Sequence, residues 1–335
     1  YCFFDEIQVL KGWEAFIDRM MRNEKCEVYI SGSSAQMLSQ EIATQMRGRA
    51  LSWEIFPFTF AEYLDYAGTE IRSNLSAAKR LKVIAKFEEY WQKGGFPEVA
   101  GLDSRLRIKI HQEYLTTILF RDIIERHNIS HPKALTDLVH WLLDNIASLY
   151  SINRLTNYLS SLGHKTSKTL VANYLNWFED AYFLYTVRLY DASLIKSNAN
   201  AKKIYCVDHA FVSSISTGIL VNSGHLLENL VFMALRRTGE KVFYYRTQNK
   251  REVDFIVIRK GRKPVLIQVS ETLVEERTYM REVRALEEAM KEMTIEKGFI
   301  ITRNEEEIVN TKSANLYIIP VWKFLLQWPE NELFE

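Results

Sequence analysis

Residues 1–6 read Tyr-Cys-Phe-Phe-Asp-Glu, an apolar run that stops at two adjacent acids. A strand that is covered on both faces loses its alternation of apolar and polar side chains, so this run predicts a short, buried parallel strand. Asp5 and Glu6 would then emerge at the carboxyl end of the strand, which is the edge where open α/β sheets bind their ligands. The stretch therefore predicts an α/β core with two carboxylates at its ligand edge.

Two carboxylates at such an edge suit phosphate chemistry. One can hold Mg²⁺, usually through its water shell, and its neighbour can orient a water for phosphoryl transfer. This is the Walker B arrangement, although two acids also end many ordinary strands by chance. Its partner, a phosphate-cradling G-x-x-x-x-G-K-[ST] loop, does not occur in the 335 residues. The interpretation therefore places that loop upstream of Tyr1, and we expect no tight binding of ATP by this chain alone.

Length and composition describe an ordinary globular protein. A chain of 335 residues exceeds the usual size of one core, so two or three domains are expected. The chain has 47% apolar and 25% charged residues. Its net charge of +1 argues against binding of polyanions over the whole surface but leaves local basic patches possible. The three cysteines lack CxxC spacing, which indicates a reducing compartment, and no apolar stretch could cross a membrane. We therefore expect a cytoplasmic protein.

A second strand follows a short amphipathic helix. The helix is expected over 13–21 and the strand over 28–30, which gives a βαβ rhythm. The strand ends in Ser31-Gly32-Ser33-Ser34, so small hydroxyls reach the same edge as the two acids. Ser33 or Ser34 could sense a γ-phosphate, or could cap the following helix. Both roles are compatible.

Five motifs in order carry a family resemblance: DEIQ (5–8), SGSS (31–34), RGR (47–49), PFTFAEYL (57–64) and GGFPE (94–98). This order resembles a family of bacterial and archaeal AAA+ ATPases that carry a C-terminal domain of unknown function. The resemblance covers the whole chain except for a missing amino-terminal quarter of the family. It implies ATP and Mg²⁺ as cofactors of the full-length protein.

The resemblance also implies roles for individual residues. Asp5 becomes the Mg²⁺ ligand, Glu6 the water-orienting base, Ser33 or Ser34 the nucleotide-binding sensor, and Arg49 an arginine finger, with Arg47 as its rival. A surface ion pair is the alternative for either arginine. Because a finger normally acts on a neighbouring subunit's nucleotide, a homo-oligomer is implied. The helical periodicity of residues 61–145 resembles the lid that packs over the nucleotide.

The middle of the chain, 146–221, predicts a winged helix. Two helices, expected over 151–162 and 167–179, are joined by a short turn, which is helix-turn-helix spacing. The outward face of the second helix carries Lys168 and Asn173, and the loop between two following strands carries Lys202 and Lys203, so these four residues form a candidate DNA-binding site. Only one cation accompanies the recognition helix, so a protein-binding winged helix is the alternative.

The C-terminal part, 222–335, has the expected order αβββαβ and resembles the PD-(D/E)XK restriction-endonuclease fold. Glu228 on the first helix and Asp254 on the second strand match two acids of that family. At the positions of the family's E-x-K motif stand Gln268 and Ser270, a weaker metal ligand and an uncharged side chain. We therefore predict no hydrolysis of DNA. Glu228 and Asp254 could still hold a metal weakly, or be relics of the fold.

The predicted fold is thus an α/β multidomain protein. It comprises a partial P-loop AAA+ core (1–60), a helical lid (61–145), a winged helix (146–221) and a restriction-endonuclease-like domain (222–335). The predicted function is an ATPase that couples ATP hydrolysis to the two C-terminal modules, and DNA, a protein client and further copies of the chain are its candidate partners. A DNA-binding module without catalysis is the alternative, and no contact with a membrane is expected.

Overall fold

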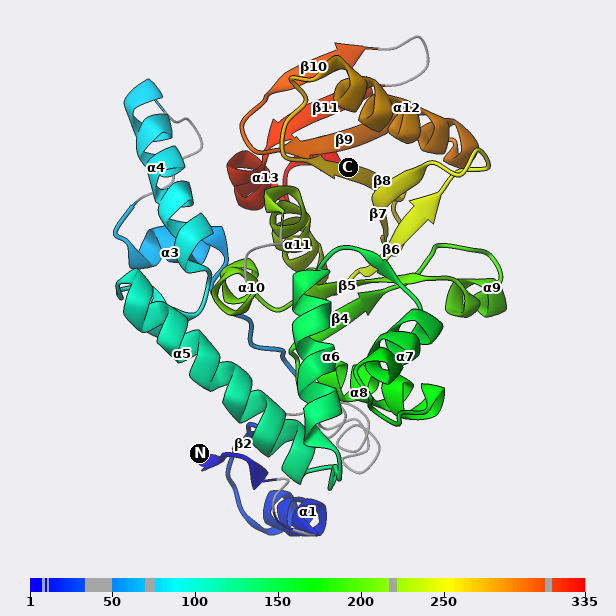
Figure 1. Cartoon of the computed structure of the whole chain (residues 1–335). Helices are drawn as coiled ribbons and strands as arrows, with labels where there is room; N and C mark the ends of the chain where they lie inside the picture. The colour runs from blue at the N-terminus through cyan, green and yellow to red at the C-terminus, as the bar shows by residue number, and fades with distance from the viewer. Residues whose placement is uncertain are drawn as a thin grey trace.

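The computed structural model describes residues 1–7, 10, 12–33, 50–69, 76–216, 222–310 and 315–334. Within these ranges the protein is a mixed α/β chain with separate two-, three- and six-stranded sheets (Figure 1). Its buried side chains form distinct clusters, so the chain contains more than one domain, as its length predicts. None of the helices in these ranges is both long and apolar enough to cross a bilayer.

The amino-terminal unit has the expected strand-helix-strand order. Strand β1 (Cys2–Phe4) pairs in parallel with β2 (Val28–Ile30), and α1 (Trp13–Asn23) connects them. Trp13 and Ile17 of α1 pack with Ile7 in a small apolar cluster. This cluster fixes the sheet edge at which both strands end.

The helices α3 (Phe60–Tyr66) and α4 (Ala77–Lys93) do not lie over that edge, contrary to the expectation for a lid. Thr59 and Glu62 form a capping box that starts α3. The apolar faces of both helices belong to the largest core, together with α11 and α13 of the C-terminal domain. In Figure 1, α3 and α4 lie at one end of the long helix α5 (Ser104–Thr117), whereas β2 and α1 lie near the other end.

Helix α5 leads without a break into η4 (Ile118–Glu125), a π-helical segment. Between α4 and α5 the short helix η3 (Pro97–Val99) starts at Pro97, which suits a first helical turn. Such π-helical segments are frequent at functional sites. Asp122 of this segment contacts Ser33 just beyond the end of β2, as described below.

The middle unit begins earlier than residue 146. Its elements are α6 (Pro132–Asp144), β3 (Leu149–Tyr150), α7 (Ile152–Ser161), α8 (Lys168–Asp180), β4 (Leu184–Val187), α9 (Leu194–Ala199), β5 (Lys202–Cys206) and α10 (His209–Ile215). The strands form an antiparallel sheet of order β3-β5-β4. Helix α6 buries Leu138 and Leu142 in the same core as α7 and α8, so it packs as part of this unit.

The C-terminal unit contains the predicted αβββαβ order. Its elements are α11 (Ser223–Arg236), β6 (Lys241–Arg246), β7 (Glu252–Ile258), β8 (Val265–Ser270), α12 (Glu276–Met293), β9 (Lys297–Thr302), β10 (Glu307–Asn310), β11 (Asn315–Pro320), α13 (Val321–Gln327) and η5 (Glu332–Phe334). The strands are ordered β10-β11-β9-β8-β7-β6. Helices α11 and α13 pack on one face of this sheet, and α12 packs on the other.

A buried histidine joins helices α5 and α10 and predicts an acid-sensitive fold. His111 of α5 is fully buried, and its Nδ1 lies 2.8 Å from Ser214 Oγ. Ser214 donates its hydroxyl hydrogen to Ala210 O, so Nδ1 must carry the hydrogen of this contact. Burial lowers the pKa of His111 to about 4, although attraction to Asp208 opposes the shift.

We expect the stability to fall as the pH drops below the ordinary histidine value. Between about pH 6.5 and pH 4 the unfolded chain binds a proton at His111 and the folded chain does not, which costs up to about 1.4 kcal/mol per pH unit. His111→Gln, which cannot be protonated, should flatten this dependence in urea unfolding at pH 7, 6 and 5. His140→Gln, at an exposed histidine, is the control. An unchanged slope in His111→Gln would contradict the assignment.

Candidate functional sites

The end of β1 gathers the carboxylates and one hydroxyl that the sequence indicated. Asp5 accepts a hydrogen bond from the Ser31 hydroxyl at the end of β2. Glu6 has a φ of 49°, in the left-handed region that non-glycine residues rarely adopt outside functional sites and turns. Its Oε2 lies 3.1 Å from Ser33 Oγ. The two acids and Ser33 therefore share one edge, whereas Ser34, Arg47 and Arg49 lie outside the described residues.

Two further residues at this edge, Asp122 in η4 and Arg126 directly after it, were not found from the sequence. Asp122 Oδ1 lies 3.3 Å from Ser33 Oγ, and Arg126 Nη2 donates to the same hydroxyl at 3.2 Å. Asp122 and Arg126 also form an ion pair of 3.7 Å. Burial raises the pKa of Asp122, while Arg126 and Ser33 oppose that rise. Only the i, i+4 spacing of an acid and an arginine was visible in the sequence, and it is common on helices.

A second polar cluster lies between the middle and C-terminal units. The ammonium of Lys203, from β5, lies 2.8 Å from Glu228 Oε1, 2.9 Å from Glu252 Oε1 and 2.8 Å from Asp254 Oδ1. Tyr205 donates its hydroxyl hydrogen to Glu228 Oε1 at 2.6 Å. Lys203 is only 3% exposed, so the cluster is an interior one.

The charges of this cluster depend on one another. Burial alone would lower the pKa of Lys203, but attraction to Asp254 and Glu228 raises it well above its usual value. Burial, and then repulsion by Asp254, raises the pKa of Glu228 to about 8. Attraction to the acidic side chains therefore holds Lys203 as a cation, whereas burial disfavours the charged form of Glu228 and Lys203 only partly offsets that effect.

Gln268 and Ser270 take structural positions beside the cluster. Gln268 donates to Glu282 Oε2 at 2.8 Å, and its Oε1 accepts from the backbone N–H of Asp254 at 3.2 Å. The Ser270 hydroxyl donates to Thr272 O at 2.9 Å. Within the described ranges, no three His, Cys, Asp or Glu side chains are arranged to hold a metal ion. Glu228 and Asp254 do come together, but around an ammonium.

The four candidate DNA-binding residues do not form one surface. Lys168 is exposed at the start of α8, whereas Asn173 and Lys202 are half-buried. Lys203 is buried among carboxylates, so the expectation that it touches phosphates is wrong. Adjacent residues of a strand point to opposite faces, which separates Lys202 from Lys203.

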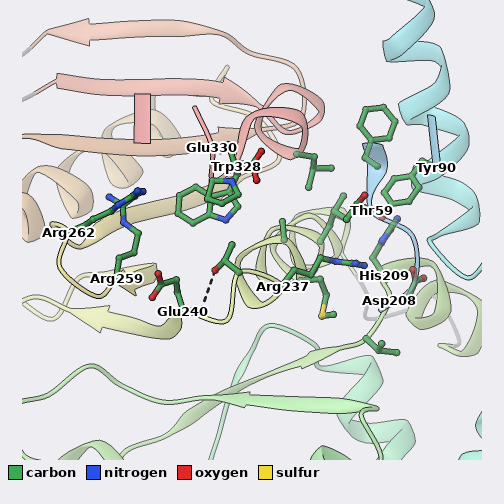
Figure 2. Close-up of a pocket in the computed structure, with 18 of the residues that line it drawn as sticks. Thr59, Tyr90, Asp208, His209, Arg237, Glu240, Arg259, Arg262, Trp328 and Glu330 are labelled. Atoms are coloured by element: carbon green, nitrogen blue, oxygen red, sulfur yellow. Dashed lines mark hydrogen bonds between the residues drawn. The ribbon is translucent and has the colours of Figure 1, made fainter. Parts of the chain in front are cut away.

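Two cavities accompany these residues. One of about 1020 Å³ lies over the second cluster and is lined by Lys203, Glu228, Glu252, Asp254 and Arg281, among others. The other, of about 680 Å³, lies beside α11 and the residues that follow α13 (Figure 2).

The polar groups of the smaller cavity have structural partners. In Figure 2, Trp328 lies between Arg259 and Arg262 on one side and Arg237 and His209 on the other. Arg237 donates to Pro57 O, and His209 Nε2 donates to Trp91 O at 3.0 Å. Asp208 accepts hydrogen bonds from the backbone N–H groups of Gly95 and Phe211. These side chains serve the packing of α3, α4 and α10 around the cavity.

Comparison with known proteins places the chain in a family. An AAA domain model matches residues 1–64, and two domains of unknown function, DUF8612 and DUF4143, match residues 84–219 and 223–324. An uncharacterized protein of Methanocaldococcus jannaschii is 34% identical over 337 residues, which cover 97% of this chain and 74% of that protein. The chain belongs to this AAA-like ATPase family. An uncharacterized protein of Haemophilus influenzae is 30% identical over 273 residues, which cover 81% of this chain and 65% of that protein.

The family matches divide the two sites between different domains. Asp5, Glu6 and Ser33 lie in the AAA domain, whereas Asp122 and Arg126 lie in the middle match. Lys203 also lies in the middle match, and its three acidic partners lie in the C-terminal match. Each site of this AAA-like family member is therefore built across a domain boundary.

Proposed function

We propose that this protein is an ATPase of the AAA type whose nucleotide cycle acts on the middle and C-terminal domains. The observation that carries the proposal is the meeting of Asp5, Glu6 and Ser33 at the carboxyl edge of β1 and β2, inside the AAA match. Asp5 would hold Mg²⁺, and Glu6 would orient the attacking water. Bound Mg²⁺ would neutralise charge on the transferred phosphoryl group of ATP.

Ser33 is the residue that we propose connects the nucleotide site to the middle domain. Its hydroxyl contacts Glu6, Asp122 and Arg126, so a change at Glu6 would alter the contacts of η4. On its buried side η4 carries Leu119 and Ile123, which pack in the core of the middle unit. A rigid helix with a polar and a buried face can transmit a small displacement because packed cores resist deformation. We therefore assign η4 as the coupling element.

The order of helices and strands supports two further domains that follow the AAA domain in the chain. The order α6, β3, α7, α8, β4, α9, β5 supports a winged helix with a short helix inserted between its last two strands, and the αβββαβ order within the C-terminal unit supports a nuclease-like fold. The hydrogen bonds of Gln268 and the ammonium of Lys203 support a C-terminal module that does not hydrolyse DNA. With Lys203 buried, a protein client suits the middle module better than a duplex, because few cations accompany α8.

ATP turnover by the full-length protein tests the proposal. We expect Glu6→Gln to lower turnover at least about 100-fold, because loss of a general base typically costs 10² to 10⁴ in rate. Binding of a fluorescent ATP analogue should be retained, since Gln keeps the shape and only the proton-accepting charge is lost. Glu24→Gln, at an exposed acid beyond the end of α1, is the matched control.

Two results would count against the ATPase assignment. One is a full-length wild-type protein that binds ATP and Mg²⁺ but does not turn ATP over. The other is a Glu6→Gln variant whose turnover equals that of Glu24→Gln.

Arg49 is proposed as an arginine finger that acts on a neighbouring subunit's nucleotide. Arg49→Ala should then lower ATP turnover without weakening ATP binding.

A further inference from the structure

Strand β5 is shared between two domains. Its even-numbered side chains, Ile204 and Cys206, belong to the apolar core of the middle unit. Its odd-numbered side chains face the other way: Lys203 reaches Glu228, Glu252 and Asp254, and Tyr205 packs in the core that contains α11. The alternation of a strand therefore gives β5 one face for its own domain and one face for the C-terminal domain.

The ammonium of Lys203 is held by acidic side chains of the C-terminal domain. It donates hydrogen bonds to Glu228 Oε1 and Asp254 Oδ1, both at 2.8 Å, and it forms an ion pair with Glu252 Oε1 at 2.9 Å. The acceptors are themselves fixed, since Asp254 Oδ2 accepts from Val269 N at 2.9 Å and Glu228 accepts from Tyr205. Loss of any of these partners would leave a buried charge unpaired, which costs folding free energy. The contacts therefore form only when β5 lies in this one position against the C-terminal domain.

The distances are those of an ammonium rather than of a metal ion. Charge-assisted N–H···O contacts are about 2.7–2.9 Å long, whereas Mg²⁺ binds oxygen at about 2.0–2.1 Å and Ca²⁺ at about 2.3–2.6 Å. Gln268, on the neighbouring strand, is engaged by Glu282 and Asp254. The cluster is therefore organised around a lysine side chain.

We propose that Glu228, Glu252 and Asp254 form a lysine socket by which the C-terminal domain docks the middle domain. The socket recognises a primary ammonium, and Lys203 is its occupant within the chain. An acidic site on the sheet of the C-terminal domain serves here as a docking device, in place of metal binding or hydrolysis. Separation of the two domains would empty the socket and expose three carboxylates.

Chemical rescue tests the socket directly. Lys203→Ala removes three methylene groups and the ammonium, which together correspond to propylammonium. The adjacent cavity of about 1020 Å³ gives a small amine a path to the carboxylates. We expect Lys203→Ala to lower the Tm of the chain by more than about 5 °C. Propylammonium at tens of millimolar should restore at least half of that loss, because it returns the charge and all three N–H donors.

Matched additives and a matched variant sharpen the test. Tetramethylammonium has the same charge but no N–H, so it should not rescue Lys203→Ala. Lys202→Ala removes the neighbouring side chain, which lies on the opposite face of β5, and should show no response to propylammonium. The proposal is overturned if propylammonium has no effect on Lys203→Ala, or if Mg²⁺ or Mn²⁺ restores the Tm as well as propylammonium does.

A second variant keeps the proposal testable if Lys203→Ala does not fold. Asp254→Asn preserves the shape of the side chain and leaves Lys203 in place, but removes one charge from the socket. It should lower the Tm by several degrees, and more than Glu252→Gln, because the side chain of Asp254 is 9% exposed whereas that of Glu252 is 31% exposed. An Asp254→Asn chain as stable as the wild type would overturn the socket.

Discussion

Lys203→Met is expected to lower the free energy of unfolding by about 3–5 kcal/mol at pH 8. Methionine fills a similar volume but provides no charge, so Glu228 and Asp254 would face each other in the interior without their cation, and Glu252 would keep its 3.8 Å contact with Arg246. Removal of one partner from a buried ion cluster is costly because the remaining charges have already lost their water. Urea unfolding of the chain, followed by tryptophan fluorescence, measures the loss.

The pH dependence of Lys203→Met identifies the source of the loss. Without Lys203 the carboxyl groups can avoid their repulsion only by binding protons, and the pKa of Glu228 is already raised to about 8 by burial and by Asp254. The folded variant therefore binds protons that the unfolded chain releases above about pH 4.5. The loss of unfolding free energy caused by Lys203→Met should thus be smaller at pH 5 than at pH 8. Lys202→Met is the control. Equal stability of the two variants at pH 8 would contradict the assignment.

Gly94→Ala is expected to cost about 3 kcal/mol or more of folding stability. Gly94 ends α4 with φ 77° and ψ −168°, a region that only glycine adopts readily. A Cβ at this position would lie 2.3 Å from Asp208 Oδ1. Asp208 cannot withdraw freely, because it accepts from Gly95 N at 2.7 Å and caps α10 through Phe211 N at 2.9 Å. The substitution therefore strains the backbone and also disrupts a buried carboxylate.

Gly163→Ala separates the cost of backbone strain from the cost of the clash with Asp208. Gly163 also has a positive φ, of 85°, but no atom would lie within 4 Å of its added Cβ. Its substitution should cost about 1 kcal/mol, from backbone strain alone. Thermal and urea unfolding of the two variants should thus differ by about 2 kcal/mol, in the direction of a less stable Gly94→Ala. A Gly94→Ala chain as stable as Gly163→Ala would show that Asp208 can move at no cost.

The local pattern of the chain was sufficient for most of the elements. Apolar periodicity predicted β1, α1 and β2, and the αβββαβ order from α11 to β9 was also predicted. These elements are specified by neighbouring residues, such as the capping box of Thr59 and Glu62. The domain to which a helix belongs is a different matter. The apolar faces of α3 and α4 lie in the core that contains α11 and α13, and that of α6 lies in the core of α7 and α8, although all three helices were expected in the lid.

The two sites differ in how far the sequence could define them. Asp5, Glu6 and Ser33 were found because parallel strands end at one sheet edge, so their positions follow from local order. Asp122 and Arg126 were missed because they reach Ser33 from 89 and 93 residues away. Lys203 was assigned to phosphates because a lysine near a loop is usually exposed. Its three carboxylate partners lie 25 to 51 residues further along the chain.

The sequence by itself determined most of the strands and helices, the motif order and the carboxylates at the end of β1, because short-range periodicity and capping specify them. Only the tertiary structure decided which charges meet. The two faces of β5 serve two domains, and the second face carries Lys203 into the socket of Glu228, Glu252 and Asp254. Charge pairing in an interior depends on the juxtaposition of distant segments, and no local pattern encodes that juxtaposition.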